Sequence, residues 1–250
     1  MRPLLSLAAL ALVASPLAAQ TVDEVITKNI QARGGLQKLK SVQSIRMTGR
    51  LAVAPGAEAP MVLELKRGNR MRMEFTFQGM TGVQAFDGTS GWAVMPFGGN
   101  KAVQPMPAEM AQEAAEQADI DGPLVDYKAK GHTVELLGKE SVDGVDAYKL
   151  KVTLKGGSQR TIWIDAAKYL EIKGEGSRPG KPGDSETMLS DYRDVGGIMF
   201  PHVVEGGPKG STQRQKIVIE KVEINPTLDD ARFKAPEAPA AEPTKTPQKP

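Results

Sequence analysis

The sequence predicts a mainly β protein with a few helices, built as one large, strongly curved antiparallel sheet or open barrel. About eleven strands are predicted, the first of which alternate apolar and polar side chains with the period of two that a half-buried strand requires, and only two segments show clear helical spacing. Strands so much more numerous than helices argue against a βαβ fold. Because a curled sheet must cover its concave face, we expect short helices or a ligand there.

Residues 1–19 have the pattern of a signal peptide. Arg2 precedes an apolar run, Leu4–Val13, and cleavage is expected before Gln20. This run is too short for a membrane-spanning helix, which needs about 20 residues. The chain contains no cysteine, which excludes disulfides and a lipid-modified cysteine after the signal. We therefore expect an exported, soluble protein that is either free in the periplasm or secreted.

Two helices are predicted. Thr21 and Glu24 have the spacing of a capping box, in which a hydroxyl and a carboxylate satisfy free backbone N–H groups at a helix start. Apolar residues then recur at helical spacing, Gly34-Gly35 favours termination, and a further turn is expected over 36–39. The second helix is predicted over 108–118, which is rich in alanine and glutamate.

Strands are predicted on both sides of the second helix. The clearest alternation places Met71, Met73, Phe75 and Phe77 on one side of a strand and charged or polar residues on the other. Gly68-Asn69, just before it, favours a tight two-residue hairpin turn. The remaining strands are predicted at 44–53, 61–66, 83–86, 91–95, 133–138, 147–154, 160–165, 169–173, 187–193, 199–205 and 215–224.

These elements are expected to form one domain over residues 20–234. Within it, the segment 174–184 consists of glycine, proline and charged residues and is predicted to be a mobile loop. Residues 235–250 are mainly alanine, proline, lysine and glutamate, so we expect a disordered tail after the domain.

Charge is balanced overall but segregated locally. The net charge of +2 does not favour nucleic-acid binding, which usually requires a strongly basic domain. Residues 25–57 contain six basic side chains and no acid, whereas residues 108–127 contain six acids and no base. Either these segments are ordinary solvated surface, or they face each other or flank a ligand entrance.

The sequence offers no recognisable catalytic or metal site. His132 and His202 are its two histidines, and neither belongs to a two-histidine metal motif. No serine lies in a G-x-S-x-G motif, and the glycine-rich stretches lack the spacing of nucleotide-binding loops. We therefore expect no enzymatic activity, no metal and no cofactor.

The apolar side of the predicted first sheet is unusual in composition. The chain has eleven methionines, whereas aromatic residues make up 5% of it, and several methionines fall on these strands. Methionine is flexible, so it suits surfaces that accept varied apolar partners. The same pattern also fits a plain core filled with methionine.

Four motifs in order along the chain resemble those of the LolA-like outer-membrane lipoprotein-sorting proteins. Each is a short combination of turn, aromatic and charged residues. They are "ARGG-x-x-x-L" (Ala32–Leu39), "DG-x-x-GW" within Phe86–Trp92 followed by Pro96, the strand pair Ile162–Asp165 and Tyr169–Lys173, and "S-D-Y-R-x-V-x-G-x-x-x-P" (Ser190–Pro201).

This resemblance implies an incomplete β-barrel with helices plugging its concave face, and a hydrophobic cavity that takes acyl chains in the periplasm. On it we base a set of expected site residues. The expected cavity residues are Met47, Leu63, Met71, Met73, Phe75, Phe77, Trp92 and Met110, and the expected head-group or entrance residues are Arg46 and Arg50.

The leading hypothesis is a carrier that binds lipid or lipoprotein acyl chains and moves them between sites of the envelope. Its expected partners are a lipid or acylated lipoprotein and transport proteins of the inner and outer membranes, with no nucleic acid, and the chain is expected to act as a monomer. The alternative is a non-transporting binding or sensor module that uses the same curved sheet. An enzyme ranks third, because the scattered acids and histidines suggest no assembled site.

Overall fold

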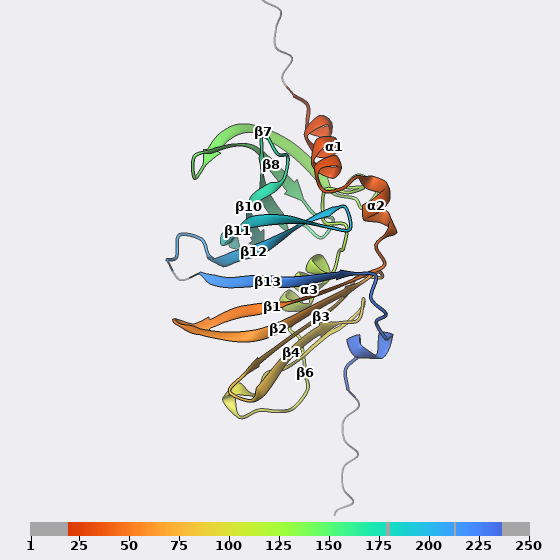
Figure 1. The fold of residues 1–250 in the computed structure, drawn as a ribbon, viewed down its shortest axis with the longest axis vertical. Coiled ribbons are helices and arrows are strands. Elements are labelled where there is room, and N and C mark those ends of the chain that lie inside the picture. Colours follow the sequence, from red (N-terminus) through yellow and green to blue (C-terminus); the bar gives the residue numbers. More distant parts are fainter. Residues whose placement is uncertain (1–19, 179–180, 213, 237–250) are drawn as a thin grey trace, which may run out of the picture.

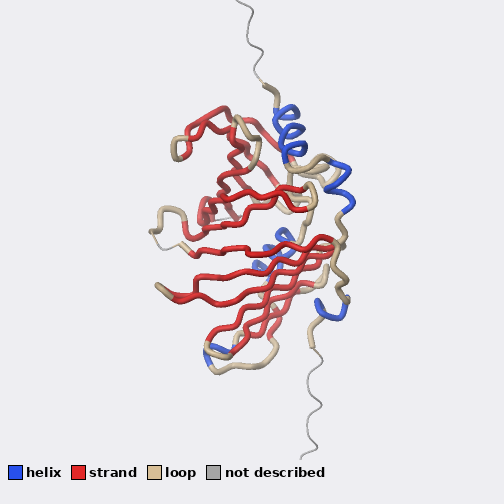
Figure 2. Tube along the Cα trace, viewed as in Figure 1, coloured by secondary structure: helices blue, strands red, loops and turns tan. Residues whose placement is uncertain are grey.

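A computed structural model describes residues 20–178, 181–212 and 214–236 (Figures 1 and 2). The predicted signal peptide and residues 237–250 of the predicted tail lie outside these ranges. Its helices are α1 (Val22–Ala32), α2 (Leu36–Ser41), α3 (Ala108–Gln117), and the short 3-10 helices η1 (Pro96–Gly98) and η2 (Asp230–Phe233). No helix in the described ranges has the length and apolar character needed to span a membrane.

The described strands form one antiparallel sheet of thirteen strands. The strands are β1 (Ser44–Ala54), β2 (Ala57–Lys66), β3 (Arg70–Phe77), β4 (Met80–Phe86), β5 (Gly91–Val94), β6 (Gln104–Pro105), β7 (Thr133–Val142), β8 (Val145–Thr153), β9 (Gln159–Asp165), β10 (Glu171–Arg178), β11 (Lys181–Val195), β12 (Ile198–Pro208) and β13 (Gln215–Ile224).

The sheet consists of two meanders joined at one seam. Its strand order is β6-β5-β4-β3-β2-β1-β13-β12-β11-β10-β9-β8-β7, so every neighbouring pair except β1–β13 is consecutive in the chain. At the seam, Ile45 of β1 pairs with Ile224 of β13. Strands β6 and β7 are the two edges and do not pair with each other, so the sheet is open. This arrangement confirms the prediction of a mainly β, open curved sheet.

Helices cover one face of this sheet, which we call the covered face. Helix α1 contacts β7, and α3 contacts β3, β4 and β5. Figure 2 shows α1 and α2 along one end of the strands and α3 behind the sheet. Helix α1 begins at the predicted capping box, because Thr21 Oγ1 accepts from Glu24 N and Glu24 accepts from Thr21 N.

The core consists of two apolar clusters that lie under the helices. The first joins Leu39 of α2 and Ala114 of α3 to the strand residues Met71 and Phe86, among others. The second joins the apolar side of α1 to β8 and β9. Ile30 of α1 contacts both clusters, so the two halves of the sheet share one continuous core.

The opposite face is closed by the chain segment that follows β13. Phe233 of η2 is fully buried, and the indole N–H of Trp92 donates a hydrogen bond to its carbonyl oxygen at 2.8 Å. Glu64, which is 1% exposed, forms ion pairs with Arg46 (3.0 Å) and Arg232 (2.8 Å). These contacts hold η2 against β2 and β5, and η2 also contacts β3.

Two local predictions were wrong. The segment 174–184 is not a loop, because β10 and β11 extend into it as a long hairpin on either side of residues 179–180. Lys173 stabilises this hairpin through ion pairs with Glu175 (3.0 Å) and Glu186 (2.8 Å). The turn between β2 and β3 has three residues rather than two, since Lys66 pairs with Arg70.

Candidate functional site

A cavity of about 180 Å³ lies on the covered face, at the end of the strands near α1 and α2. Its walls come from α1, α2, the start of β1, the loop after α3, and strands β10, β11 and β12. Most of the lining is apolar, namely Leu39, Val42, Ile45, Ile120, Pro123, Leu124, Leu189, Ile198, Met199, Phe200 and Pro201. The cavity therefore offers an apolar ligand a place inside the protein.

Four polar side chains also line this cavity: Asn29, Arg33, Glu171 and Tyr192. Burial raises the pKa of the Glu171 carboxyl to about 7, although the positive charges of two arginines act against this rise. Burial also raises the pKa of Tyr192, and the charge of Glu171 adds to this effect. The Tyr192 hydroxyl donates to the backbone oxygen of Glu171 at 2.8 Å.

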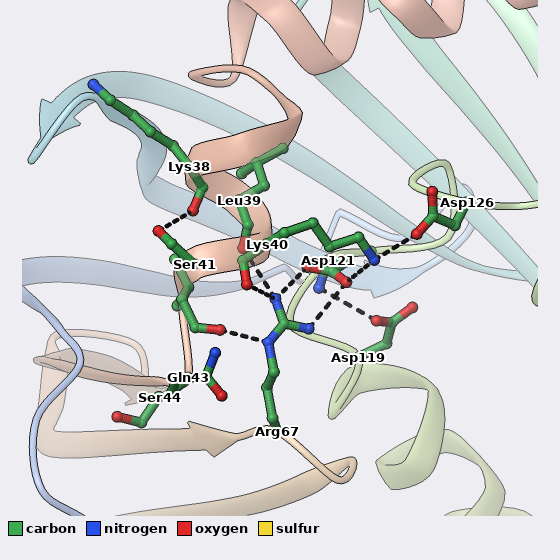
Figure 3. A network of polar contacts seen from close by, with 12 residues as sticks. Lys38, Leu39, Lys40, Ser41, Gln43, Ser44, Arg67, Asp119, Asp121 and Asp126 are labelled. Carbon is green, nitrogen blue, oxygen red and sulfur yellow. Dashed lines mark hydrogen bonds and ion pairs between the residues drawn. The ribbon is translucent and has the colours of Figure 1, made fainter.

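The loop beside the cavity is fixed by an ion-pair network centred on Asp121 (Figure 3). Arg67, from the β2–β3 turn, donates to both carboxylate oxygens of Asp121, at 2.9 and 3.1 Å. The same guanidinium donates to the Leu39 and Val42 carbonyl oxygens at the end of α2. Arg67 thus connects the β2–β3 hairpin, α2 and the loop that contributes Pro123 and Leu124 to the cavity wall.

Asp121 is almost completely buried, yet it stays ionised. Burial alone would raise the pKa of its carboxyl, but hydrogen bonds from Arg67 and Lys40 lower that pKa to about 2. Lys40 pairs with Asp121 at 2.9 Å and with Asp126 at 2.6 Å. The basic segment 25–57 and the acidic segment 108–127 therefore face each other, as one of the two readings of their charge predicted.

Six of the expected cavity residues lie on the covered face but outside the lining of this cavity. Met71 belongs to the same apolar cluster as the cavity residue Ile45, and Met47 and Leu63 pack against that cluster. Strand pairing places Leu63 opposite Met73 and Met61 opposite Phe75, so the apolar surface continues along β2 and β3. The six residues are Met47, Leu63, Met71, Met73, Phe75 and Phe77.

The other two expected cavity residues lie elsewhere. Trp92 is on the opposite face, because it pairs with Ala85 and its indole contacts η2. The guanidinium of Arg72 lies 5.5 Å from the Trp92 ring centre, so a charged side chain covers this tryptophan on that face. Met110 lies on α3 and is 40% exposed.

The two expected entrance residues also point to the opposite face, where both form ion pairs. Arg46 binds the buried Glu64, as described above. Arg50 pairs with Glu220 at 2.9 Å and with Glu58 at 3.5 Å. The structure therefore does not bring these arginines to the cavity described here.

The polar cavity residues were not identified from the sequence, although Asn29 left a signal. It follows Val25 by four residues and Ile26 by three, which puts an amide on the apolar side of α1. Such a buried polar residue is a reason to look for a partner. Nothing comparable marks Glu171, which stands at the start of an ordinary strand.

A second pocket, of about 460 Å³, lies between α3 and the β8–β9 turn. Its lining is mainly polar and includes His132, whose pKa is lowered by burial and by the charge of Lys130. Four charged groups in this pocket form two ion pairs, Arg160 with Glu116 at 2.8 Å and Lys130 with Asp119. This pocket is therefore less suited to an acyl chain than the first one.

Comparisons with known proteins find the fold but not a sequence family. No protein-family model matches the chain, and no curated protein matches it. A DUF1329 family protein from Desulfovibrio piger is 14% identical with a TM-score of 0.60, and the alignment covers 86% of this chain and 98% of that one.

Two further solved structures are similar to the same extent. A LolA superfamily protein from Nitrosomonas europaea is 16% identical with a TM-score of 0.59, over 87% of this chain and 99% of the other. An outer membrane lipoprotein-sorting protein domain from Vibrio parahaemolyticus is 14% identical with a TM-score of 0.57, over 84% and 94%. These alignments extend over nearly the whole sheet and its helices. The chain therefore shares its fold with these three proteins, as the resemblance of its sequence motifs predicted.

Proposed function

We propose that this chain is exported to the periplasm, binds the acyl chain of a lipid or lipoprotein on the covered face, and carries it between sites of the envelope. The observation that best supports this function is the apolar cavity beneath α1 and α2, in a fold shared with lipoprotein-sorting proteins. In this proposal the chain is a binding protein and not an enzyme.

The size of the cavity fits one end of such a ligand. A volume of about 180 Å³ is similar to that of an engineered apolar cavity of about 150 Å³ that binds benzene, so it accommodates a group of about that size. A long acyl chain therefore needs more room, and the neighbouring apolar surface can provide it. Met47, Leu63 and Met71 belong to or pack against the cluster that contains the cavity residue Ile45, and methionine side chains rearrange easily. Each buried CH₂ group adds about 0.8 kcal/mol to binding.

The test uses displacement of a neutral apolar dye, N-phenyl-1-naphthylamine, by acyl lipids. Leu189→Trp fills the cavity from β11, so we expect it to reduce dye and lipid binding at least tenfold. Leu137→Trp is the matched control, because Leu137 is 52% exposed on β7 and should leave binding unchanged. Absence of binding by the unaltered protein, together with an empty protein after purification from its host envelope, would favour a sensor or other binding module.

A further inference from the structure

Two of the four polar side chains that line the cavity, Asn29 and Glu171, present acceptor oxygens that have no hydrogen-bond partner in the described part of the chain. Asn29 is 2% exposed, and its Nδ2 donates to the Tyr169 carbonyl oxygen at 2.8 Å. That bond fixes the orientation of the amide, since a flipped amide would turn its oxygen toward another oxygen. The other end, Oδ1, is buried without a hydrogen-bond partner in the described part of the chain. A buried acceptor without a partner destabilises the protein, so a donor from outside the chain is favoured there.

Glu171 provides a second acceptor in the same cavity. Its carboxylate takes part in no hydrogen bond or ion pair within the described ranges. The nearby Tyr192 hydroxyl has its hydrogen directed to the Glu171 backbone oxygen, so it does not serve the carboxylate. The two acceptors belong to neighbouring parts of the structure, because Asn29 donates to the backbone oxygen of Tyr169, which lies two residues before Glu171 in the chain.

The charges around these acceptors do not favour an anion. Arg33 is the one cationic side chain in the cavity lining as described, and its Nη1 donates to the Asp121 backbone oxygen at 3.0 Å. Lys40 and Arg67 lie close by on α2 and the β2–β3 turn, but both are paired with Asp121. A carboxylate or phosphate next to the unpaired Glu171 would meet a like charge in a poorly solvated place.

We propose that Asn29 Oδ1 and the Glu171 carboxyl recognise an uncharged, hydrogen-bond-donating head group, such as the hydroxyls of an acylglycerol, while the acyl chain lies along the apolar lining. This inference deepens the proposed function and rests on it. Hydroxyl groups can donate to both acceptors at once, and Arg33 can donate to a hydroxyl or ester oxygen. A neutral head group also leaves the charges of Arg33 and Glu171 balanced.

The experiment compares three ligands with the same oleoyl chain: monooleoylglycerol, methyl oleate and oleate. Each ligand is titrated into the full-length mature protein with bound N-phenyl-1-naphthylamine at pH 8, and displacement of the dye is measured. Two hydrogen bonds of about 1 kcal/mol each correspond to a preference of at least tenfold for monooleoylglycerol over methyl oleate. We expect oleate to bind at least tenfold more weakly than monooleoylglycerol as well.

Two variants test the two acceptors separately. Asn29→Leu should reduce the preference for monooleoylglycerol over methyl oleate to threefold or less, while methyl oleate binding is kept. Glu171→Gln removes the negative charge and should strengthen oleate binding several-fold, which a merely structural change would not do. Gln31→Leu is the matched control, because Gln31 lies exposed on the same helix.

The outcomes separate this inference from the proposed function. If all three ligands bind equally and neither variant changes their order, the head-group site is refuted and the acyl-binding function stands. The head-group site is also refuted if Asn29→Leu changes stability but not the order of the ligands. In the unaltered protein a bound water would then donate to the Asn29 oxygen. If none of the three ligands displaces the dye, the proposed function fails first and the head-group site with it.

Discussion

Asp121 connects three separate parts of the chain, and its replacement tests whether this network stabilises the fold. We predict that Asp121→Asn lowers the free energy of unfolding by about 2 kcal/mol at pH 7. The pKa of this carboxyl falls from 3.8 to about 2 on folding, and each unit of difference corresponds to about 1.4 kcal/mol. A loss of this size should lower the melting temperature by about 4–8 °C in a chain of this length.

The pH dependence of this loss follows from the sign of the shift. Because the folded pKa is depressed, the stabilisation is complete above the unfolded value of 3.8 and is lost as the pH falls through about 2. Urea unfolding should therefore show a difference between the two proteins of about 2 kcal/mol at pH 7 and about half of that at pH 3.

Asp126→Asn is the matched control for this experiment. Asp126 also pairs with Lys40, but its side chain is 44% exposed, whereas that of Asp121 is 4% exposed. An exposed pair contributes at most about 1 kcal/mol, so this variant should unfold almost like the unaltered protein. Equal losses for the two variants, or a loss for Asp121→Asn that does not shrink at pH 3, would refute the reasoning.

Three further predictions concern other parts of the molecule. In the unaltered protein the pKa of Glu171 is raised to about 7, so the free energy of unfolding should fall by about 3 kcal/mol between pH 4.5 and 8 as this carboxyl ionises. Glu171→Gln should flatten this decline, and urea unfolding of both proteins at pH 5 and 8 measures the difference. Phe233→Ala should cost about 3–5 kcal/mol in thermal unfolding, whereas deletion of Pro236–Pro250 should change the melting temperature little. Met73→Trp should keep near-native stability and lose binding of a fluorescent acyl probe. Leu150→Trp, in the fully buried part of β8, should instead lower the free energy of unfolding by about 1–3 kcal/mol or more.

The sequence was most informative where local pattern decides structure. Alternation along Met71–Phe77 depends on neighbours in the chain, so it predicted both the strand and the face that carries its apolar residues. The capping box at Thr21 succeeded for the same reason. The long hairpin after Glu171 was missed because glycine and proline are poor strand formers. There, strand pairing and cross-strand ion pairs outweigh local preference.

The candidate site depended on contacts that no local pattern contains. Asn29 and Glu171 are more than a hundred residues apart in the chain, and only the folded structure brings both into the lining of one cavity. The face of Trp92 was equally undetermined, since β5 has only four residues. Its pairing with Ala85 on β4 places it opposite the methionines. For Asn29 and Glu171 the deciding information is the packing of α1 against the sheet. For Trp92 it is the strand register, because a shift of one residue moves every side chain of a strand to the other face.

The seam between β1 and β13 has a consequence for how this protein acquires its structure. Each meander is built from consecutive hairpins, so both can form early from local contacts. The pairing of Ile45 with Ile224 must wait until β13 has emerged from the ribosome or the membrane translocation machinery. Until then, β1 and β12 present unpaired backbone edges that can pair with other chains. A protein of this design therefore depends on protection from aggregation until its last strand arrives, and a substitution that slows closure of the seam would reduce the yield of folded protein.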